Sequence, residues 1–525
     1  MKKINHEFSE KKSESYSSCC GQHEHTSNNL SRREFVKVTG ATTIGAVAIS
    51  GLSWSVLASA QNLENAAIQR RALVVKPIFI YATPTRKNQR SWRSWGAIQT
   101  EQDADKEIVR IQDELKKLHT QADFPVQFLS ITRVNIEQDF NDFGNMETVD
   151  VFLIYAAGRK LDMLDALYKT GKNMIIFCRH KSGPVYHGYE YISPRFLRHN
   201  TDNLSLTGVD ENDVVVDSQD ELMWRLRALC GLKNTVASRI IAIGGSGAWG
   251  QPEGVVQKLV DEKFKLDIRT ISYEELGKLI KEAQSDNELV ARAKSRADKY
   301  LNDDKISLET ERQFVDNAFV LEDIFRRIMD KYNCRAITIK GCMSTIIPLA
   351  ETTACLTLSL LNDAGYLAFC ESDFVAIPAG ILLANISGKP AFLNDPTYPH
   401  NGVITLAHCT APRRMDGEKL EPARIVTHFE SDYGAAPKIE MCLDQTVSNI
   451  MADFSVNHYV GVLGKIVDNP FMDICRSQID VSYNSDDKIV AEKMRGFHWV
   501  TVYGDYMKEI EYALKRIEIK FDNLV

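Results

Sequence analysis

Short apolar runs alternate with segments of helical periodicity across residues 61–388, and this alternation restricts the possible fold more than any other feature. The first pair is a strand at residues 73–81 and a helix at 105–122, in which apolar side chains recur every three or four positions. Further strands are predicted at residues 124–131, 151–155, 173–178, 239–243, 266–271 and 335–340. Repeated β-α units of this kind predict parallel sheets with right-handed crossovers.

The fold expected from this pattern is α/β: two parallel-sheet α/β domains followed by a smaller β-rich C-terminal domain. The predicted domains are residues 61–235, 236–388 and 389–525. A helix over residues 221–230 with Gly231 at its end closes the first domain. The third domain is richer in short strands and turns, and a helix with an apolar stripe, residues 507–517, is expected to close the chain.

A stretch at residues 369–409 carries most of the candidate chemistry. Three apolar runs, at residues 366–370, 390–393 and 403–407, are each followed by a polar side chain: Glu371, Asp395 and His408. In α/β folds, groups just past the carboxyl ends of strands share one crevice, so we expect these three to meet. Two carboxylates and an imidazole suit a hard divalent metal or acid–base catalysis.

Simpler structural roles remain open for the acidic residues of this stretch. Asp373 precedes an apolar run at residues 375–386 and could cap that helix. Asp395 precedes Pro396 and could be an ordinary turn residue. His498 stands at the start of the apolar run 499–503. A lone histidine in such a place is more often structural, and a metal ligand is the alternative.

The polar loop over residues 91–96 is a candidate substrate-binding element. It carries Trp92, Arg93 and Trp95 within six residues. Aromatic faces stack on sugar rings, and arginine binds hydroxyls or anions. The alternative is a pair of tryptophans that pack over the edge of a domain.

A glycine-rich turn over residues 245–250, with the sequence GSGAWG, follows the strand at 239–243. The pattern formally matches a dinucleotide-binding turn. Three features argue against that use: Pro252 delays the next helix, Trp249 is bulky, and the strand at 266–271 ends without an acidic residue. We therefore favour a tight glycine turn at the mouth of a cleft.

The first sixty residues have the features of an export signal. The segment SRREFVK at residues 31–37 resembles a twin-arginine motif, an apolar Gly/Ala-rich segment follows, and Ala58-Ser59-Ala60 is a typical cleavage site. We expect a periplasmic or otherwise exported protein that uses the twin-arginine translocation machinery and keeps no permanent membrane anchor. The net charge of −7 and the lack of a basic stripe give no reason to expect nucleic-acid binding.

The cysteine pattern does not predict a disulfide scaffold. Nine cysteines follow the signal, which is an odd number, and the sequence contains no C-x-x-C pair and no zinc or iron–sulfur spacing. Most lie in apolar contexts, where buried free thiols are common.

Several segments together resemble the L-fucose/L-arabinose isomerase-like family. They are LLNDAGYLAFCESD, GKPAFLNDP, ITLAHC and GFHWVTVYGDY in the C-terminal half, with the SWRSWG loop and the RIIAIGGSGAW turn before them. The resemblance covers most of residues 70–525 in order and is best at 340–409 and 496–520.

This resemblance implies a metal-dependent aldose–ketose isomerase that usually uses Mn²⁺ and assembles as a homo-oligomer, a trimer or hexamer. By motif, the metal ligands would be Glu371, Asp395 and His498, and Glu371 and Asp395 would also exchange the proton of an enediol. Trp92 or Trp95 of a neighbouring subunit would line the sugar site. His408 would bind a substrate hydroxyl or orient a ligand.

Two other functions are compatible with the sequence. One is a non-catalytic carbohydrate-binding protein on the same scaffold. The other is an NADP-dependent sugar oxidoreductase, which needs the GSGAWG turn to bind a pyrophosphate.

Overall fold

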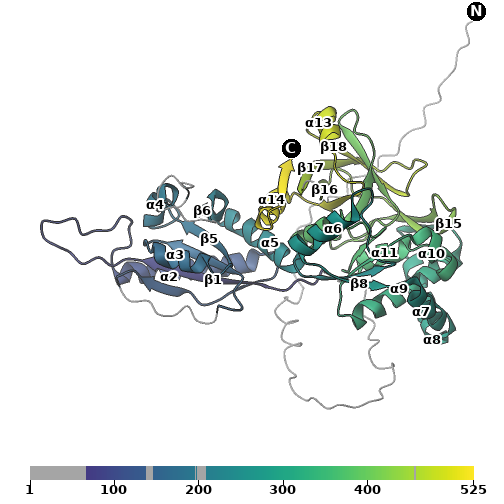
Figure 1. The fold of residues 1–525 in the computed structure, drawn as a ribbon, viewed down its shortest axis with the longest axis horizontal. Helices are drawn as coiled ribbons and strands as arrows, with labels where there is room; N and C mark the ends of the chain where they lie inside the picture. The colour runs from purple at the N-terminus through teal and green to yellow at the C-terminus, as the bar shows by residue number, and fades with distance from the viewer. Residues whose placement is uncertain (1–66, 138–145, 196, 198–208, 455–456, 525) are drawn as a thin grey trace, which may run out of the picture. The chain divides into compact units, whose positions relative to one another are not determined.

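The strand expected at residues 73–81 is β1 (Leu73–Tyr81), which lies inside a parallel sheet of six strands (Figure 1). The computed structural model describes residues 67–137, 146–195, 197, 209–454 and 457–524. The strand order is β2-β1-β4-β5-β6, and β3 pairs with the second half of β1. The other strands are β2 (Val126–Phe128), β3 (Thr132–Asn135), β4 (Val151–Ala156), β5 (Asn173–Cys178) and β6 (Val214–Val216).

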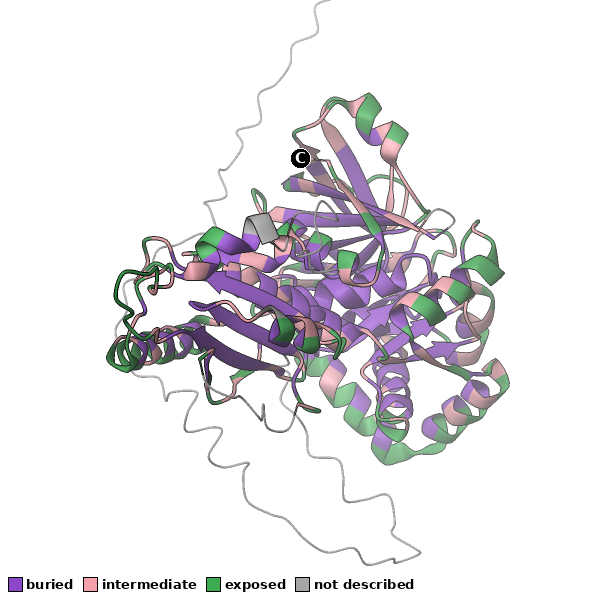
Figure 2. Cartoon of the chain, turned by 60° about the vertical axis from the view of Figure 1, so that its left-hand side comes forward, coloured by how far each residue is buried: buried purple, intermediate pink, exposed green. Residues whose placement is uncertain are grey.

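Four helices accompany this sheet in the described part of the first α/β region. They are α2 (Glu101–Gln121), α3 (Leu161–Tyr168), α4 (His187–Arg195) and α5 (Gln219–Thr235). In α2, Ala104, Ile111, Leu115 and Leu118 are buried while the intervening polar residues are largely exposed (Figure 2). The helical periodicity in the sequence thus marks the face that covers the sheet.

The second α/β region is built on a parallel sheet of four strands in the order β11-β10-β7-β8. Its strands are β7 (Arg239–Ile243), β8 (Asp267–Ile271), β10 (Ala336–Ile339) and β11 (Leu367–Phe369). Its helices are α6 (Glu253–Leu259), α7 (Tyr273–Ser285), α8 (Asn287–Leu301), α9 (Arg312–Lys331), α10 (Cys342–Ala350), α11 (Cys355–Asp363) and α12 (Ile377–Ser387). Both parallel sheets agree with the predicted fold class.

The C-terminal region contains a sheet that closes on itself. Its order is β16-β19-β12-β13-β18-β17, and β17 pairs back onto β16. The strands are β12 (Phe392–Pro396), β13 (Val403–His408), β16 (Thr446–Asp453), β17 (His458–Asp468), β18 (Ser477–Tyr483) and β19 (Trp499–Tyr503). Two helices, α13 (Asp487–Lys493) and α14 (Met507–Arg516), accompany it. This region is β-rich, as the sequence indicated.

Four details of the sequence interpretation are wrong. The strand expected at residues 124–131 is two short strands, β2 and β3. The last element is the strand β20 (Lys520–Asn523), which pairs with β17, rather than a helix. Strand β9 (Ile306–Leu308) pairs across the expected domain boundary with β14 (Ala423–His428), which also pairs with β15 (Tyr433–Ile439).

Gly231, the fourth case, lies inside α5 instead of ending it. A Cβ atom at this position would lie 2.3 Å from Ile386 Cγ1 of α12. The glycine therefore permits α5 and α12 to pack in close contact. From the sequence pattern alone, this glycine was interpreted as the end of a helix. Arg227 of α5 also pairs with Glu509 of α14 at 2.7 Å, so α5 connects the first sheet to the C-terminal elements.

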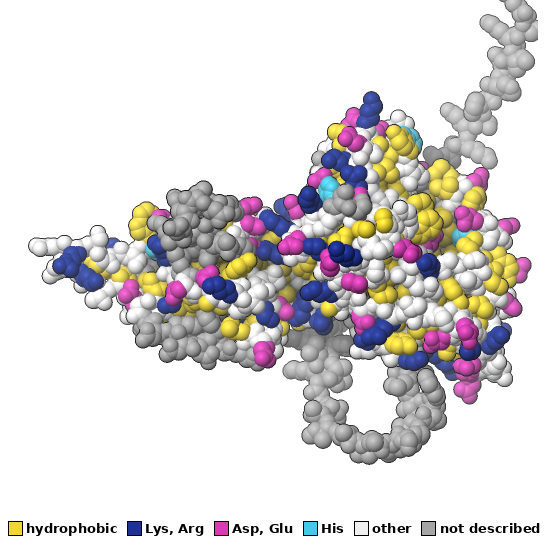
Figure 3. Space-filling view, viewed as in Figure 1, with side chains coloured by type: hydrophobic (Ala, Val, Ile, Leu, Met, Phe, Trp, Pro, Cys, Tyr) yellow, Lys and Arg dark blue, Asp and Glu magenta, His cyan; other side chains and the backbone are white. Residues whose placement is uncertain are grey.

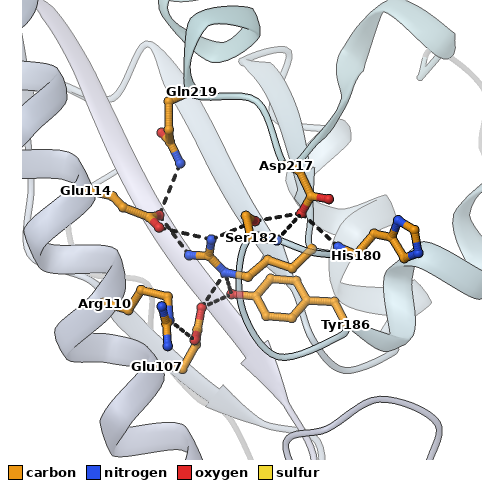
Figure 4. Close-up of polar contacts among 9 residues, drawn as sticks. Glu107, Arg110, Glu114, His180, Ser182, Tyr186, Asp217 and Gln219 are labelled. Atoms are coloured by element: carbon orange, nitrogen blue, oxygen red, sulfur yellow. Dashed lines mark hydrogen bonds and ion pairs between the residues drawn. The ribbon is translucent and has the colours of Figure 1, made fainter.

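A buried ionic network fixes the loop that follows β5 (Figure 4). The Arg179 guanidinium donates to Glu107 at 2.6 Å and to Glu114 at 2.8 Å, and the Tyr186 hydroxyl donates to Glu107 at 2.6 Å. Asp217 accepts hydrogen bonds from the backbone of His180, Lys181 and Ser182. The Arg179 guanidinium and the Asp217 carboxylate therefore both have partners within the protein, so we interpret the network as structural.

The surface and the termini complete the description. On the face shown in Figure 3, Lys and Arg side chains are interspersed with Asp and Glu side chains. Among the described residues no single helix combines the length and apolar character needed to cross a membrane; α10 and α11 qualify only when counted together, across a 90° bend. The predicted twin-arginine signal lies outside the described residues.

Candidate metal centre

Four side chains that the sequence singled out converge on one point. The Nε2 atom of His498 lies 3.5 Å from Oε2 of Glu371 and 3.3 Å from Oδ1 of Asp395. The Nε2 atom of His408 lies 3.7 Å from Oε1 of Glu371. Both imidazoles are buried, and both carboxylates are about one-third exposed, at 31%. Two groups of ligand atoms within 4.8 Å of one another share His408: Asp395 with His408 and His498, and Glu371 with His408 and Cys370.

Strand pairing brings Asp395 and the histidines together. Strand β12 pairs antiparallel with β19, with Asn394 opposite Trp499, so the next step in register sets Asp395 opposite His498. On its other side β12 pairs with β13, with Asp395 opposite Ala407, the residue before His408. The expectation that these groups meet at the carboxyl ends of parallel strands is therefore wrong for Asp395 and His408, which meet through antiparallel pairing.

Glu371 reaches the same point from the four-stranded parallel sheet. It stands two residues past β11, at the carboxyl edge, as expected for an α/β crevice. Glu371 and Ser372 both have left-handed backbone conformations, with φ of 63° and 48°. Such conformations cost non-glycine residues about 1–3 kcal/mol each and persist where the surroundings enforce them. Here Ser372 N donates to Thr338 Oγ1 and Gly247 N donates to Ser372 O.

Asp373 performs two tasks at once. Its Oδ1 accepts a hydrogen bond from Val375 N at 3.0 Å in the turn before α12. The N-cap of α12 is Ala376, without a side-chain cap, so the capping role considered from sequence is wrong. The Oδ2 atom of Asp373 lies 2.8 Å from His498 Nδ1, and both side chains are fully buried. A carboxylate at Nδ1 holds the proton there and leaves Nε2 as a lone-pair donor, which is the usual arrangement for a metal-ligating histidine. No pattern in the sequence indicated this second role of Asp373.

The electrostatics of the two acids differ. Burial alone would raise the pKa of Glu371, but hydrogen bonds and charges from His408 and His498 outweigh it and hold the pKa well below its usual range. Burial raises the pKa of Asp395 in spite of the same histidines. Burial alone would lower the pKa of His498. Hydrogen bonds with Asp373 and Glu371 outweigh burial and raise the pKa to about 9.

The donor atoms at this point fit a divalent metal. Four of them are buried without a hydrogen-bond partner: Glu371 Oε2, Asp395 Oδ1, His408 Nε2 and His498 Nε2. Unpartnered buried polar atoms are rare because each costs about 1–3 kcal/mol. The ligand atoms of Asp395, His408 and His498 lie within 4.8 Å of one another, so this group of side chains could hold a metal ion.

A cavity of about 560 Å³ is lined by Glu371, Asp395 and His408, and His498 lies behind them. At its mouth the rings of Trp249 and Phe497 stack with centroids 4.5 Å apart, and both are nearly half exposed. In the sequence, Trp249 was noted only as a bulky residue of the glycine turn, and Phe497 was not singled out. The turn itself packs against the segment after Glu371, through Gly247 N to Ser372 O and Phe374 N to Gly247 O. It is thus a glycine turn at a cleft, as favoured from sequence.

The tryptophan loop does not reach this cavity within one chain. Trp92, Arg93 and Trp95 are absent from the described residues that line it. Trp95 is 67% exposed, and the Arg93 guanidinium lies over the Trp92 ring at 5.1 Å. In a single chain this loop is a surface feature of the first α/β region.

Cysteines form another part of the cavity wall. All nine cysteines of the described residues are free thiols, and five of them line the cavity: Cys342, Cys355, Cys370, Cys409 and Cys475. The neighbouring thiol of Cys355, followed by burial, raises the pKa of Cys409 well above its usual value. Their clustering comes from segments far apart in the chain, so no sequence spacing marks it.

Comparison with known proteins adds no family: no protein-family model matches this chain, and no curated protein matches it.

Proposed function

We propose that the chain is a metal-dependent sugar isomerase that interconverts an aldose and a ketose through an enediol. The observation that carries the proposal is the set of four buried donor atoms without hydrogen-bond partners, of which those of Asp395, His408 and His498 belong to one group within 4.8 Å. Glu371, Asp395 and His498 would hold the ion, with His408 as a further nitrogen donor. Oxygen and imidazole donors suit Mn²⁺, which we propose as the ion.

The residues around the centre have the chemistry that such a reaction requires. A bound divalent ion would supply Lewis-acid stabilisation of the negative charge that develops on the substrate oxygens. Glu371 would remove the proton from the carbon beside the carbonyl, and Asp395 would return one at the neighbouring carbon. His408 would hydrogen-bond a substrate hydroxyl if it is not a ligand itself. The burial of both imidazoles keeps bulk water from the floor of the site.

The aromatic pair at the cavity mouth supports a sugar as the substrate. The exposed faces of Trp249 and Phe497 offer an apolar surface next to the polar centre. A sugar ring has apolar C–H faces and polar edges, so it could stack on these rings while its hydroxyls turn to the acids and histidines.

The signal-like features of the first sixty residues lead us to propose export by the twin-arginine route. The family resemblance leads us to propose assembly as a trimer or hexamer. The exposed loop with Trp92 and Trp95 would then contribute to the cavity of a neighbouring subunit. Mixed oligomers test this: a Trp95→Ala subunit combined with a Glu371→Gln subunit should regain activity only if the two residues serve one site from different chains.

The test of activity begins with purified protein stripped of metal by a chelator. Mn²⁺ is added back, and pentoses, hexoses and deoxyhexoses are screened for isomerisation. We expect turnover that depends on Mn²⁺ and is lost in Glu371→Gln and Asp395→Asn. The matched control is Glu282→Gln, an exposed carboxylate on α7 outside the cavity.

Two results would contradict the proposal. Sugar binding with no turnover in the metal-loaded protein would favour a carbohydrate-binding protein on the same scaffold. Isomerisation by Glu371→Gln at the parental rate would remove Glu371 from the mechanism.

A further inference from the structure

Three donors of softer chemical character lie in the same cavity as the carboxylate centre. The ligand atoms of Cys355, Cys409 and His428 lie within 4.8 Å of one another, and all three residues are buried. They come from three separate elements: Cys355 begins α11, Cys409 directly follows β13, and His428 ends β14. All three line the cavity, so an ion could reach them from its interior.

Each of the two cysteines has a neighbouring group that stabilises the thiolate, the form of cysteine that binds a metal. The backbone N–H of Arg476 donates to Cys409 Sγ at 3.4 Å, a contact that stabilises negative charge on sulfur. Cys355 is the first residue of the nine-residue helix α11, whose N-terminus has no side-chain cap. Helix N-termini lower the cost of a thiolate.

The placement of His428 is also specific. The pairing of β14 with β15 shifts register between Val426 and His428, and a shift of this kind turns a side chain away from the regular pleat. The Nδ1 atom of His428 lies 3.4 Å from Ser431 Oγ, which leaves Nε2 for a ligand. The thiol of Cys475 contacts that of Cys409 beside this group.

We propose that Cys355, Cys409 and His428 form a second metal site, selective for an ion that prefers thiolate and imidazole ligands, with Zn²⁺ as its occupant. Zn²⁺ favours tetrahedral sites with sulfur and nitrogen donors, whereas the carboxylate centre offers oxygen and nitrogen. Binding releases the proton of each ligating thiol. This inference stands apart from the proposed isomerase activity, since it depends on none of Glu371, Asp395 and His498.

Co²⁺ in place of Zn²⁺ gives a direct readout, because thiolate ligation produces a charge-transfer band that oxygen and nitrogen ligands do not. Reduced, metal-free protein should show this band on Co²⁺ addition, and Zn²⁺ should abolish it. The band should be lost in Cys355→Ser with Cys409→Ser and persist in Glu371→Gln with Asp395→Asn. The control is Cys334→Ser, a buried thiol outside the cavity whose contacts with Arg239 O and Ala336 O a hydroxyl can replace.

A measurement on the unmodified protein covers the case in which the cysteine variants fail to fold. X-ray absorption at the zinc edge should reveal sulfur neighbours at about 2.3 Å. A zinc shell of oxygen and nitrogen only would overturn the proposal. So would a Co²⁺ band that survives loss of both thiols, or a Cys355–Cys409 disulfide in place of the two free thiols.

Discussion

The Nδ1 atom of His498 lies 2.8 Å from Oδ2 of Asp373, and neither side chain has any exposed surface. The two residues are 125 positions apart in the chain, yet this contact sets which nitrogen of the imidazole faces Glu371 and Asp395. Asp373 therefore acts as a positioning residue for the candidate metal centre.

Replacement of Asp373 by asparagine tests this relationship. The Oδ1 atom of asparagine can still accept from Val375 N, but its amide N–H₂ would face His498 Nδ1 and force the proton onto Nε2. We expect Mn²⁺ affinity to fall about 10- to 100-fold. Calorimetric titration of the metal-free protein measures it. An unchanged affinity would show that the orientation of His498 does not depend on Asp373.

Asp395→Asn should affect stability in opposite directions with and without metal. In metal-free protein the change removes one of two buried acids whose oxygens lack hydrogen-bond partners, so the unfolding midpoint should rise. In the parent, Mn²⁺ at a hundred times its Kd should stabilise the fold by about 2.7 kcal/mol. The variant should lose this gain. Thermal scans with and without Mn²⁺ separate the two effects, and a drop in the metal-free midpoint would contradict the reasoning.

Trp249→Ala should weaken sugar binding while leaving the metal centre intact. The indole stacks on Phe497 at the cavity mouth and forms no hydrogen bond with the acids among the described contacts. We expect KM to rise about tenfold, which corresponds to ~1.4 kcal/mol, with unchanged Mn²⁺ affinity. Tyr398→Ala, which removes an aromatic ring that is 74% exposed outside the cavity, is the matched control. Equal KM values in the two variants would exclude the aromatic platform.

Glu421 gives the stability of the fold a pH dependence. Burial raises the pKa of this carboxyl to about 7, against the hydrogen bond from Tyr503. Below about pH 4.5 the group is protonated in both states. As the pH rises from there to about 7, only the unfolded chain loses the proton, so the free energy of unfolding falls, by on the order of 2–3 kcal/mol in all.

Glu421→Gln should flatten this part of the profile, while Glu282→Gln, an exposed control, should leave it unchanged. Chemical unfolding between pH 4.5 and 7.5 measures the slope. A slope in Glu421→Gln equal to that of the parent would assign the pH dependence to other groups.

Much of the architecture could be predicted because periodicity is a local property. The run at residues 73–81 and the amphipathic pattern of α2 specified a buried strand and a covering helix before any tertiary contact was known. Predictions failed where distant segments decide the outcome. Gly231 resembles a helix stop in sequence, but the close packing of α12 explains it. Strand β9 is short, and its pairing with β14 holds it in the sheet.

The sequence by itself determined the residue types of the candidate centre, since Glu371, Asp395, His408 and His498 stand out as polar groups beside buried runs. Only the tertiary structure decided that they meet, because the pairing of β12 with β19 and with β13 sets their separation. The same holds for Asp373 at His498 and for the thiols around His428. Side chains that are far apart in a chain become neighbours through strand register and helix packing, and these depend on contacts that no local pattern encodes.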